Sequence, residues 1–375
     1  MRTARAIPLL LLAAACSDPP PARSVPVAPP PVSAAVATAI ESADPPPPPP
    51  FEPLKVTLEQ GAMGTRILMT AYTSPEVGED ATKVALARAF REIQRLEKLM
   101  STWVADSEIS RINDAAGKEA VSVGPETFAV LEKSVWIGKE SQGVFDISFD
   151  AMRGLWKFDE GVDGSIPKKA DIDRARKLID YRKITLDGAS RTVKLERKGM
   201  RINLGGIAKG YAVDAAARVL DEAGVKGFFV QAGGDLFVRG KKPDGTPFRV
   251  GVRDPRGSGP TDYFAMIQIE DHAFSTAGDY ERAFVKDKKR YHHIIDPRTG
   301  YPATACRSVT VWAKDAFVAD ALDDAVFILG PEKGLALIEA HPDAGAVIVD
   351  AKNKVHVSKR LEGLVFIQRQ PTEGI

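Results

Sequence analysis

The chain has 375 residues, of which 44% are hydrophobic, and its formal net charge is +1. This length allows one large or two smaller domains with a real hydrophobic core. The balance of 51 basic against 50 acidic residues argues against nucleic acid as the main partner.

The first fifteen residues, MRTARAIPLLLLAAA, carry two arginines, no acid, a leucine run and then small residues up to Cys16. This order is typical of a secretory signal, and the apolar run is too short to remain as a membrane span. LAAAC resembles the bacterial lipobox, although Ala13 stands where leucine is more usual. We therefore expect a lipidated Cys16 as the mature N-terminus, with an ordinary cleaved signal as the alternative.

Residues 17–53 contain fourteen of the 27 prolines in the chain. Such a segment cannot build a core and favours extended polyproline conformation, so we interpret it as a tether and less readily as a ligand of SH3-type domains. The expected organisation is a signal peptide (1–15), Cys16 with the tether (16–53) and a folded domain (54–375). Cys306 is the only other cysteine, and we expect it to be a buried apolar residue.

The folded part shows helical and strand patterns in irregular alternation. Apolar spacing predicts a helix over 84–100, and Pro125 opens a second helix that continues to residue 135. Further predicted elements are a hairpin (183–195), a helix (209–223) ended by Gly224, strands (228–232, 248–252, 263–269, 309–312), a helix (320–340) interrupted at Gly330-Pro331, and a hairpin (346–357). Because no regular βαβ rhythm emerges, the fold class expected is α+β.

Paired glycines mark two places where a ligand can approach the main chain. In INLGGIAKGYAVD (202–214), we expect a short strand, a turn at Gly205-Gly206 and a helix carrying Lys209, an arrangement that favours anionic groups. The spacing matches neither a Walker A loop nor a dinucleotide-binding fingerprint, and a tight structural turn is the alternative. In QAGGDLFVRG (231–240), the glycines before Asp235 are taken as a strand bend or bulge.

YHHIIDPRTGYPA (291–303) places two of the five histidines next to each other. Neighbouring residues of a strand point to opposite faces, so at most one of His292 and His293 faces a site. A histidine pair in the core or on the surface is the alternative.

The apolar helix in ADALDDAVFILG (319–330) carries three carboxylates. Asp320 and Asp324 share a helix face, with Asp323 beside them, and like charges at this spacing repel one another. A divalent cation would remove the repulsion, and ligands that are all oxygen suit Mg²⁺. A solvated acidic turn near the helix start is the alternative.

Taken in order, eight stretches resemble the ApbE family of FAD:protein FMN transferases over residues 61–338. They are AMGT (62–65), LMSTWVADSEISRIN (99–113), GVFDISFDAMRGLW (143–156), INLGGIAKGYAVD (202–214), QAGGDLFVRG (231–240), STAGDYERAF (275–284), HHIIDPRTGYPA (292–303) and ADALDDAVFILGPEKGLALI (319–338). A lipoprotein signal and a spacer fit the usual location of the family, anchored in the bacterial cell envelope and facing the periplasm or exterior.

The resemblance implies an ApbE-like α+β domain of mixed sheet and helix, with an FAD site between sub-lobes. It also implies a Mg²⁺-dependent reaction in which FAD is split and FMN is attached through a phosphoester bond to a Thr or Ser of an acceptor protein, releasing AMP. Acceptors in the family are membrane electron-transfer subunits or extracytoplasmic flavoproteins. The alternatives are a Mg²⁺-dependent FAD pyrophosphatase and a lipid-anchored FAD-binding protein without turnover.

Site residues carry over by position. The implied metal site comprises Asp320, Asp324, the neighbouring Asp323 and the main-chain carbonyl of Gly206. The implied FAD contacts are Met63, Trp103, Val144, Phe145, Asp146, Asn203, Lys209 and Ile294. For Trp103 alone, ordinary core packing is the alternative. His293 is the expected proton acceptor for the acceptor hydroxyl, with Asp320 or Asp324 as alternatives. The chain departs from the family in having Asp324 where threonine is common and Ala277 where serine is common.

Overall fold

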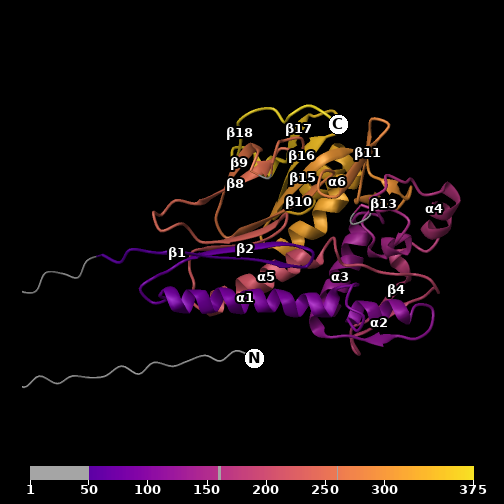
Figure 1. The fold of residues 1–375 in the computed structure, drawn as a ribbon, viewed down its shortest axis with the longest axis horizontal. Coiled ribbons are helices and arrows are strands. Elements are labelled where there is room, and N and C mark those ends of the chain that lie inside the picture. Colours follow the sequence, from indigo (N-terminus) through magenta and orange to yellow (C-terminus); the bar gives the residue numbers. More distant parts are fainter. Residues whose placement is uncertain (1–49, 159–161, 260) are drawn as a thin grey trace, which may run out of the picture. The chain divides into compact units, whose positions relative to one another are not determined.

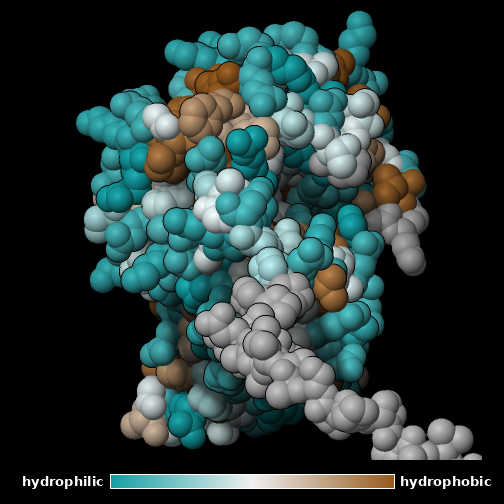
Figure 2. Space-filling model, turned by 90° about the vertical axis from the view of Figure 1, so that its left-hand side faces the viewer, coloured by the Kyte–Doolittle hydropathy of each residue, from teal (hydrophilic) through white to brown (hydrophobic). Residues whose placement is uncertain are grey.

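The computed structural model describes residues 50–158, 162–259 and 261–375, and Phe51–Ile375 form one compact unit. The predicted signal, Cys16 and nearly all of the tether lie outside the described residues, so these assignments stay predictions. Within the described part of the chain, no helix is both long enough and apolar enough to cross a membrane. The face drawn in Figure 2 is mostly hydrophilic, with small separate hydrophobic patches.

An eight-stranded antiparallel sheet forms the centre of the domain (Figure 1). Its strands, in spatial order, are β1 (Lys55–Ala62), β2 (Thr65–Tyr72), β6 (Phe228–Ala232), β7 (Asp235–Arg239), β10 (His272–Gly278), β15 (Cys306–Ala313), β16 (Ala344–Asp350) and β17 (Val355–Val357). Two-residue turns join β1 to β2 and β6 to β7, and positive φ angles at Met63 (53°), Gly64 (67°) and Gly233 (61°) make these turns possible.

Three long helices cover one face of this sheet: α1 (Glu79–Met100), α5 (Ala208–Glu222) and α6 (Ala316–Glu339). A second, smaller core lies on the other face, under β8 (Phe248–Arg253), β9 (Tyr263–Ile269) and β18 (Val365–Ile367). Strand alternation produces the two cores: in β7, for example, Phe237 joins the helix-side core while Leu236 and Val238 join the other. Side chains at alternate positions of β7 and β10 therefore face the helices.

The remaining elements stand around this centre. They are α2 (Glu108–Asp114), β3 (Val121–Ser122), α3 (Pro125–Glu140), a 3₁₀ helix (Ile147–Met152), α4 (Lys169–Arg176), a 3₁₀ helix (Tyr181–Lys183), β4 (Ile184–Asp187), β5 (Thr192–Leu195), β11 (Ala283–Lys286), β12 (Lys289–His292), β13 (Ile295–Asp296), β14 (Tyr301–Pro302) and a 3₁₀ helix (Lys359–Leu361). The structure confirms the α+β class and the predicted helices and hairpins, including the stop at Gly224 (φ 80°) and the break at Gly330 (φ 80°) before Pro331.

One predicted element is wrong: residues 201–204, before the Gly205-Gly206 turn, form no strand. The amide side chain of Asn113 explains the difference. Its Nδ2 donates to the carbonyl of Ile202 (3.0 Å) and its Oδ1 accepts from the N–H of Ile202 (2.7 Å). A side chain thus satisfies both main-chain groups that a neighbouring strand would otherwise bond.

Candidate active site

Helices α5 and α6 meet at their first turns, where Gly210 lies against α6. The N–H of Gly210 donates to Oδ2 of Asp320 at 2.8 Å. A Cβ added at Gly210 would lie 2.2 Å from the carbonyl oxygen of Ala316, so only glycine permits this approach. Asp214, one turn further along α5, accepts hydrogen bonds from the N–H groups of Ala316 and Phe317, both at 2.9 Å, and caps the start of α6.

Strands β7 and β10 deliver two further polar side chains to the same place. Asp235 follows the Gly233-Gly234 turn, and Ser275 occupies the helix-facing register of β10 between Ala273 and Ala277. The hydroxyl of Ser275 lies 2.6 Å from Oδ1 of Asp235 and 2.6 Å from Oδ2 of Asp323. The predicted bend at the paired glycines is therefore a hairpin turn, and it positions an acid of the site.

Lys209 is the cation at the centre of this cluster. Its Nζ lies 2.6 Å from Oδ2 of Asp235 and 3.4 Å from Oδ1 of Asp320. Burial alone would lower the pKa of Lys209, but the attraction of Asp235 and Asp320 outweighs burial and raises it. Lys209 is therefore fully charged, and one ammonium faces four carboxyl groups.

Three of these carboxyl groups, those of Asp320, Asp323 and Asp324, have raised pKa values because they are buried close together. Burial, followed by repulsion from Asp235, raises the pKa of Asp320 to about 7, and burial raises that of Asp324 to about 6. Burial and the neighbouring Asp324 raise the pKa of Asp323 well above its usual range. A serine hydroxyl has a single proton, so the second short contact of Ser275 is satisfied when Asp323 is protonated and donates.

The donor set fits a divalent cation chemically. Asp324 is half-buried, and no hydrogen bond from a described residue reaches its carboxylate, which lies close enough to Gly206 that a Cβ there would be 2.8 Å from Oδ2. Excess buried negative charge and oxygen ligands suit Mg²⁺. Among the described residues, no three or more His, Cys, Asp or Glu side chains are grouped so as to hold a metal by themselves. The metal site of Asp320, Asp323, Asp324 and the Gly206 carbonyl therefore stays a prediction. Asp323 already uses both oxygens, since Oδ1 accepts from the N–H of Asp324 at 2.5 Å.

The two neighbouring histidines have different surroundings. In His292, Nε2 lies 2.7 Å from the carbonyl of Ala303 and Nδ1 accepts from the N–H of Ile294 (3.3 Å), so both nitrogens serve the fold. In His293, Nδ1 is buried and finds no hydrogen-bond partner in the described structure. Burial, with help from His292, Arg282 and Lys209, lowers the pKa of His293 to about 3. His293 is therefore neutral and keeps one nitrogen for a bound group.

Asn203 and Trp103, two of the residues predicted to contact the flavin, both lie next to Thr102. Asn203 donates through Nδ2 to Oγ1 of Thr102 and to Oδ1 of Asp150, both at 3.3 Å. Trp103, next to Thr102, is 85% exposed, and the Arg153 guanidinium lies 5.1 Å from its ring centroid. This exposure excludes core packing and leaves an aromatic face open for stacking.

The other predicted contacts are more enclosed. Met63 holds φ 53°, which is uncommon for a residue other than glycine, and its N–H donates to Oε1 of Glu97 at 2.8 Å. Asp146 uses its carboxylate internally, accepting from the N–H groups of Ser148 (2.8 Å) and Tyr181 (2.7 Å). Val144, Phe145 and Ile294 are buried. The flavin roles of these residues stay predictions.

The sequence pattern assigned no role to several residues that the structure brings to the Lys209 cluster or to Asn203 and Trp103. They are Asp150, Arg153, Asp214, Asp235 and Ser275. Ser275 and Asp235 had a detectable signal, because each occupies a strand position whose alternate neighbours are core residues.

Over most of its length, the chain is similar to known proteins of one family. The family model described as "ApbE family" matches residues 63–348. The FAD:protein FMN transferase of Treponema pallidum is 32% identical over 311 residues, covering 79% of this chain and 84% of its own. The ApbE protein of Thermotoga maritima has a TM-score of 0.75 at 31% identity, covering 83% of this chain and 99% of its own. The flavin transferase ApbE of Vibrio cholerae has a TM-score of 0.74 at 26% identity, with 84% and 100% covered.

These similarities first define the class of protein: the chain is an enzyme, a transferase. More closely, it belongs to the ApbE family.

Proposed function

We propose that this protein is a Mg²⁺-dependent FAD:protein FMN transferase. The acceptor hydroxyl oxygen forms a bond to the phosphorus of the FMN half of FAD, the pyrophosphate bond breaks, and AMP leaves. The hydroxyl proton passes to a base of the enzyme, and FMN remains on a Thr or Ser through a phosphoester bond. The observation that carries the proposal is the excess of buried carboxylates around Lys209, beside the Gly206 turn.

Phosphoryl transfer depends mainly on positioned charge and on an aligned nucleophile. Asp320 and Asp324, with the carbonyl of Gly206, would hold a Mg²⁺ ion, which neutralises charge on the pyrophosphate oxygens when bound. Asp323 would stand beside these ligands, since Ser275 and the N–H of Asp324 already occupy its oxygens. Lys209 supplies a fixed positive charge for the same oxygens, because Asp235 and Asp320 hold its ammonium in place.

His293 is the proposed proton acceptor. Its neutral ring has an unpartnered Nδ1 and is influenced by the charges of Lys209 and Arg282. An anionic pyrophosphate beside it would oppose those charges and raise its pKa toward the value of a useful base. His292 holds the adjoining main chain through Ala303 and Ile294, and so fixes the direction of His293.

Incubation with FAD, Mg²⁺ and a candidate acceptor protein tests the proposal. Fluorescent flavin on the denatured acceptor, with AMP released in equal amount, is the expected result. FMN and AMP without labelled acceptor would indicate a pyrophosphatase, and unchanged FAD would indicate a binding protein.

We further propose that Cys16 carries a lipid and tethers the domain to the cell envelope. A Cys16→Ala variant should then leave the membrane fraction, and deletion of 17–50 should leave turnover on a soluble acceptor intact. A large loss of turnover in the deletion would show that the segment is more than a spacer.

A further inference from the structure

The β11–β12 hairpin is an isolated two-stranded sheet with a strong positive charge. Residues 281–290, ERAFVKDKKR, contain five basic and two acidic side chains. Figure 1 shows β11 in a hairpin at the margin of the domain, and no other described strand pairs with either of its outer edges. Unpaired edges offer main-chain N–H and C=O groups to an extended peptide.

Four cations of the hairpin lack an Asp or Glu partner among the described residues. No salt bridge joins a described Asp or Glu side chain to any of four cations, Lys286, Lys288, Lys289 and Arg290. Lys286 bonds the main-chain carbonyl of Gly164 (3.1 Å). A surface that keeps its cations unpaired attracts an acidic partner and accelerates its association.

A pocket of about 310 Å³ opens beside this hairpin. The residues that give it its charge are Arg256, Asp279, Lys288, Lys289, Arg290 and Arg307. Its single acidic side chain, that of Asp279, is already bonded to both terminal nitrogens of Arg256, at 2.6 and 2.8 Å. The pocket therefore holds more positive charge than its own acid neutralises.

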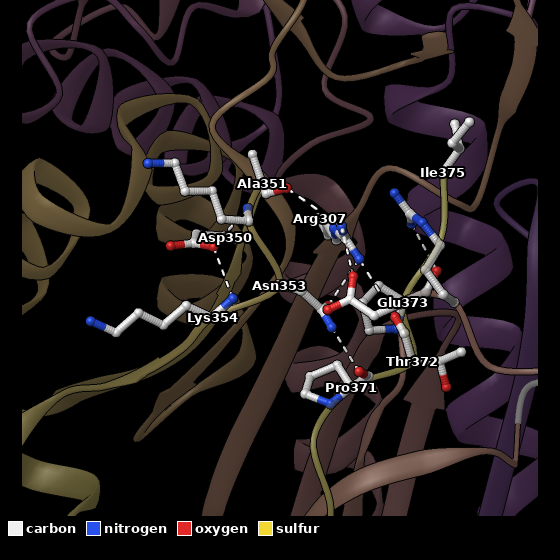
Figure 3. A network of polar contacts seen from close by, with 12 residues as sticks. Arg307, Asp350, Ala351, Asn353, Lys354, Pro371, Thr372, Glu373 and Ile375 are labelled. Atoms are coloured by element: carbon white, nitrogen blue, oxygen red, sulfur yellow. Dashed lines mark hydrogen bonds and ion pairs between the residues drawn. The ribbon is translucent and has the colours of Figure 1, made fainter. Parts of the chain in front are cut away.

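Arg290 has the least satisfied guanidinium of this group. Its Nη2 donates to the main-chain oxygen of Ile375 (2.6 Å), while its Nε is buried without a partner in the described structure. Arg307, in contrast, is held by Asn353 (2.9 Å) and by Thr372 and Glu373, as Figure 3 shows. Burial and the nearby Arg256 lower the pKa of Arg290, which means that they disfavour its charged form. A carboxylate in the pocket would stabilise the charged guanidinium through a charge-assisted hydrogen bond.

The hairpin and the pocket adjoin the active site. The carbonyl of Arg282, just before β11, accepts from the N–H of His293 at 3.1 Å. His292, the neighbour of His293, contributes to the wall of the pocket. The base of the hairpin therefore lies next to the proposed proton acceptor.

We propose that the β11–β12 hairpin and this pocket dock an extended, acidic segment of the acceptor protein. A carboxylate of the segment enters the pocket beside Arg290, and the hydroxyl that receives FMN lies next to His293. This proposal rests on the proposed function for the identity of the partner, but the binding surface can be tested without turnover.

Fluorescence anisotropy with the full chain provides the test. The probes are two fluorescein-labelled peptides, one of alternating Asp and Thr and one of alternating Asn and Thr. We expect the Asp peptide to bind at least about tenfold more tightly at low salt, and the Lys288→Glu/Lys289→Glu variant to lose about tenfold in affinity for it. Arg290→Gln should weaken binding in the same direction, with an unchanged melting temperature showing that the variant folds.

The matched control is Lys118→Glu/Lys198→Glu, which reverses two exposed lysines that follow α2 and β5 and should bind the Asp peptide as the wild type does. Equal binding of both peptides, or an equal loss in the control, would overturn the proposal. Displacement of the Asp peptide by an equal concentration of inorganic phosphate would also overturn it, because the pocket would then be a site for small anions.

Kinetics separate this proposal from the proposed function. With an acceptor protein, Lys288→Glu/Lys289→Glu should raise the KM for the acceptor and leave the KM for FAD unchanged. If no FMN is transferred by any variant but the Asp peptide still binds selectively, the proposed function fails and the docking surface stands. If transfer proceeds with an unchanged acceptor KM, the docking surface fails alone.

Discussion

The N–H of Gly210 donates to the carboxylate of Asp320 at 2.8 Å, which ties the first turn of α5 to α6. This bond exists because Gly210 has no side chain to separate the helices. The same contact holds Lys209 and Asp320 within reach of each other, so the packing of two helices and the charge of the site depend on one residue.

Gly210→Ala is expected to destabilise the protein, although alanine usually favours a helix by about 1 kcal/mol. The new Cβ would lie 2.2 Å from the carbonyl oxygen of Ala316, so the helices must separate, at about 1–3 kcal/mol. The melting temperature and the rate of FAD turnover should both fall. Gly188→Ala is the control, because nothing lies within 4 Å of its added Cβ. Equal stability of the two variants would contradict the close packing.

Asp320→Ala is expected to abolish turnover, and EDTA should have the same effect on the wild type. The variant removes a proposed metal ligand and the partner of Gly210, so Mg²⁺ should raise the melting temperature of the wild type only. Asp343→Ala, at an exposed position, serves as the control. Full activity of Asp320→Ala after metal removal would eliminate the metal assignment.

Asp324→Thr tests why this chain carries an extra acid. Asp324 has no hydrogen-bond donor among the described residues, so threonine removes a charge without breaking a bond. We expect weaker Mg²⁺ binding, seen as a higher Mg²⁺ concentration for half-maximal turnover, with turnover recovered at saturating Mg²⁺. Tighter Mg²⁺ binding in the variant would show that Asp324 is not a ligand.

The two histidines should respond differently to substitution by glutamine. His293→Gln is expected to lower turnover by about 10²–10⁴-fold with little change in melting temperature, because its Nδ1 has no partner to lose. His292→Gln should lower the melting temperature, since both of its nitrogens are bonded. If His292→Gln were the stable variant, the two roles would have to be exchanged.

Much of the fold could be predicted from the sequence because the signals are local. Apolar spacing, Pro125 and Gly224 define helices without reference to distant residues. The missing strand at 201–204 could not be predicted, because its main chain is satisfied by Asn113, which lies about ninety positions earlier. In the site, the family resemblance indicated Lys209 and Asp320. Ser275 and Asp214 could not be predicted, because their partners in the site lie far away in the sequence and meet them only in the folded structure.

Asp214→Asn should change the dependence of stability on pH. Burial raises the pKa of Asp214 to about 7 even though its carboxylate accepts two main-chain N–H groups at the start of α6. Its ordinary value is 3.8, so between these values the folded state binds the proton and the unfolded state does not. The stabilisation from the neutral form is therefore lost as the pH rises through this window, and stays lost above about 7.

Asparagine does not titrate, so wild type should exceed Asp214→Asn in stability by more near pH 5 than near pH 8, as measured by urea unfolding. Other carboxyl groups titrate in both proteins and cancel in the difference. A difference that grew with rising pH would mean that the ionised carboxylate, and not the neutral acid, stabilises the cap.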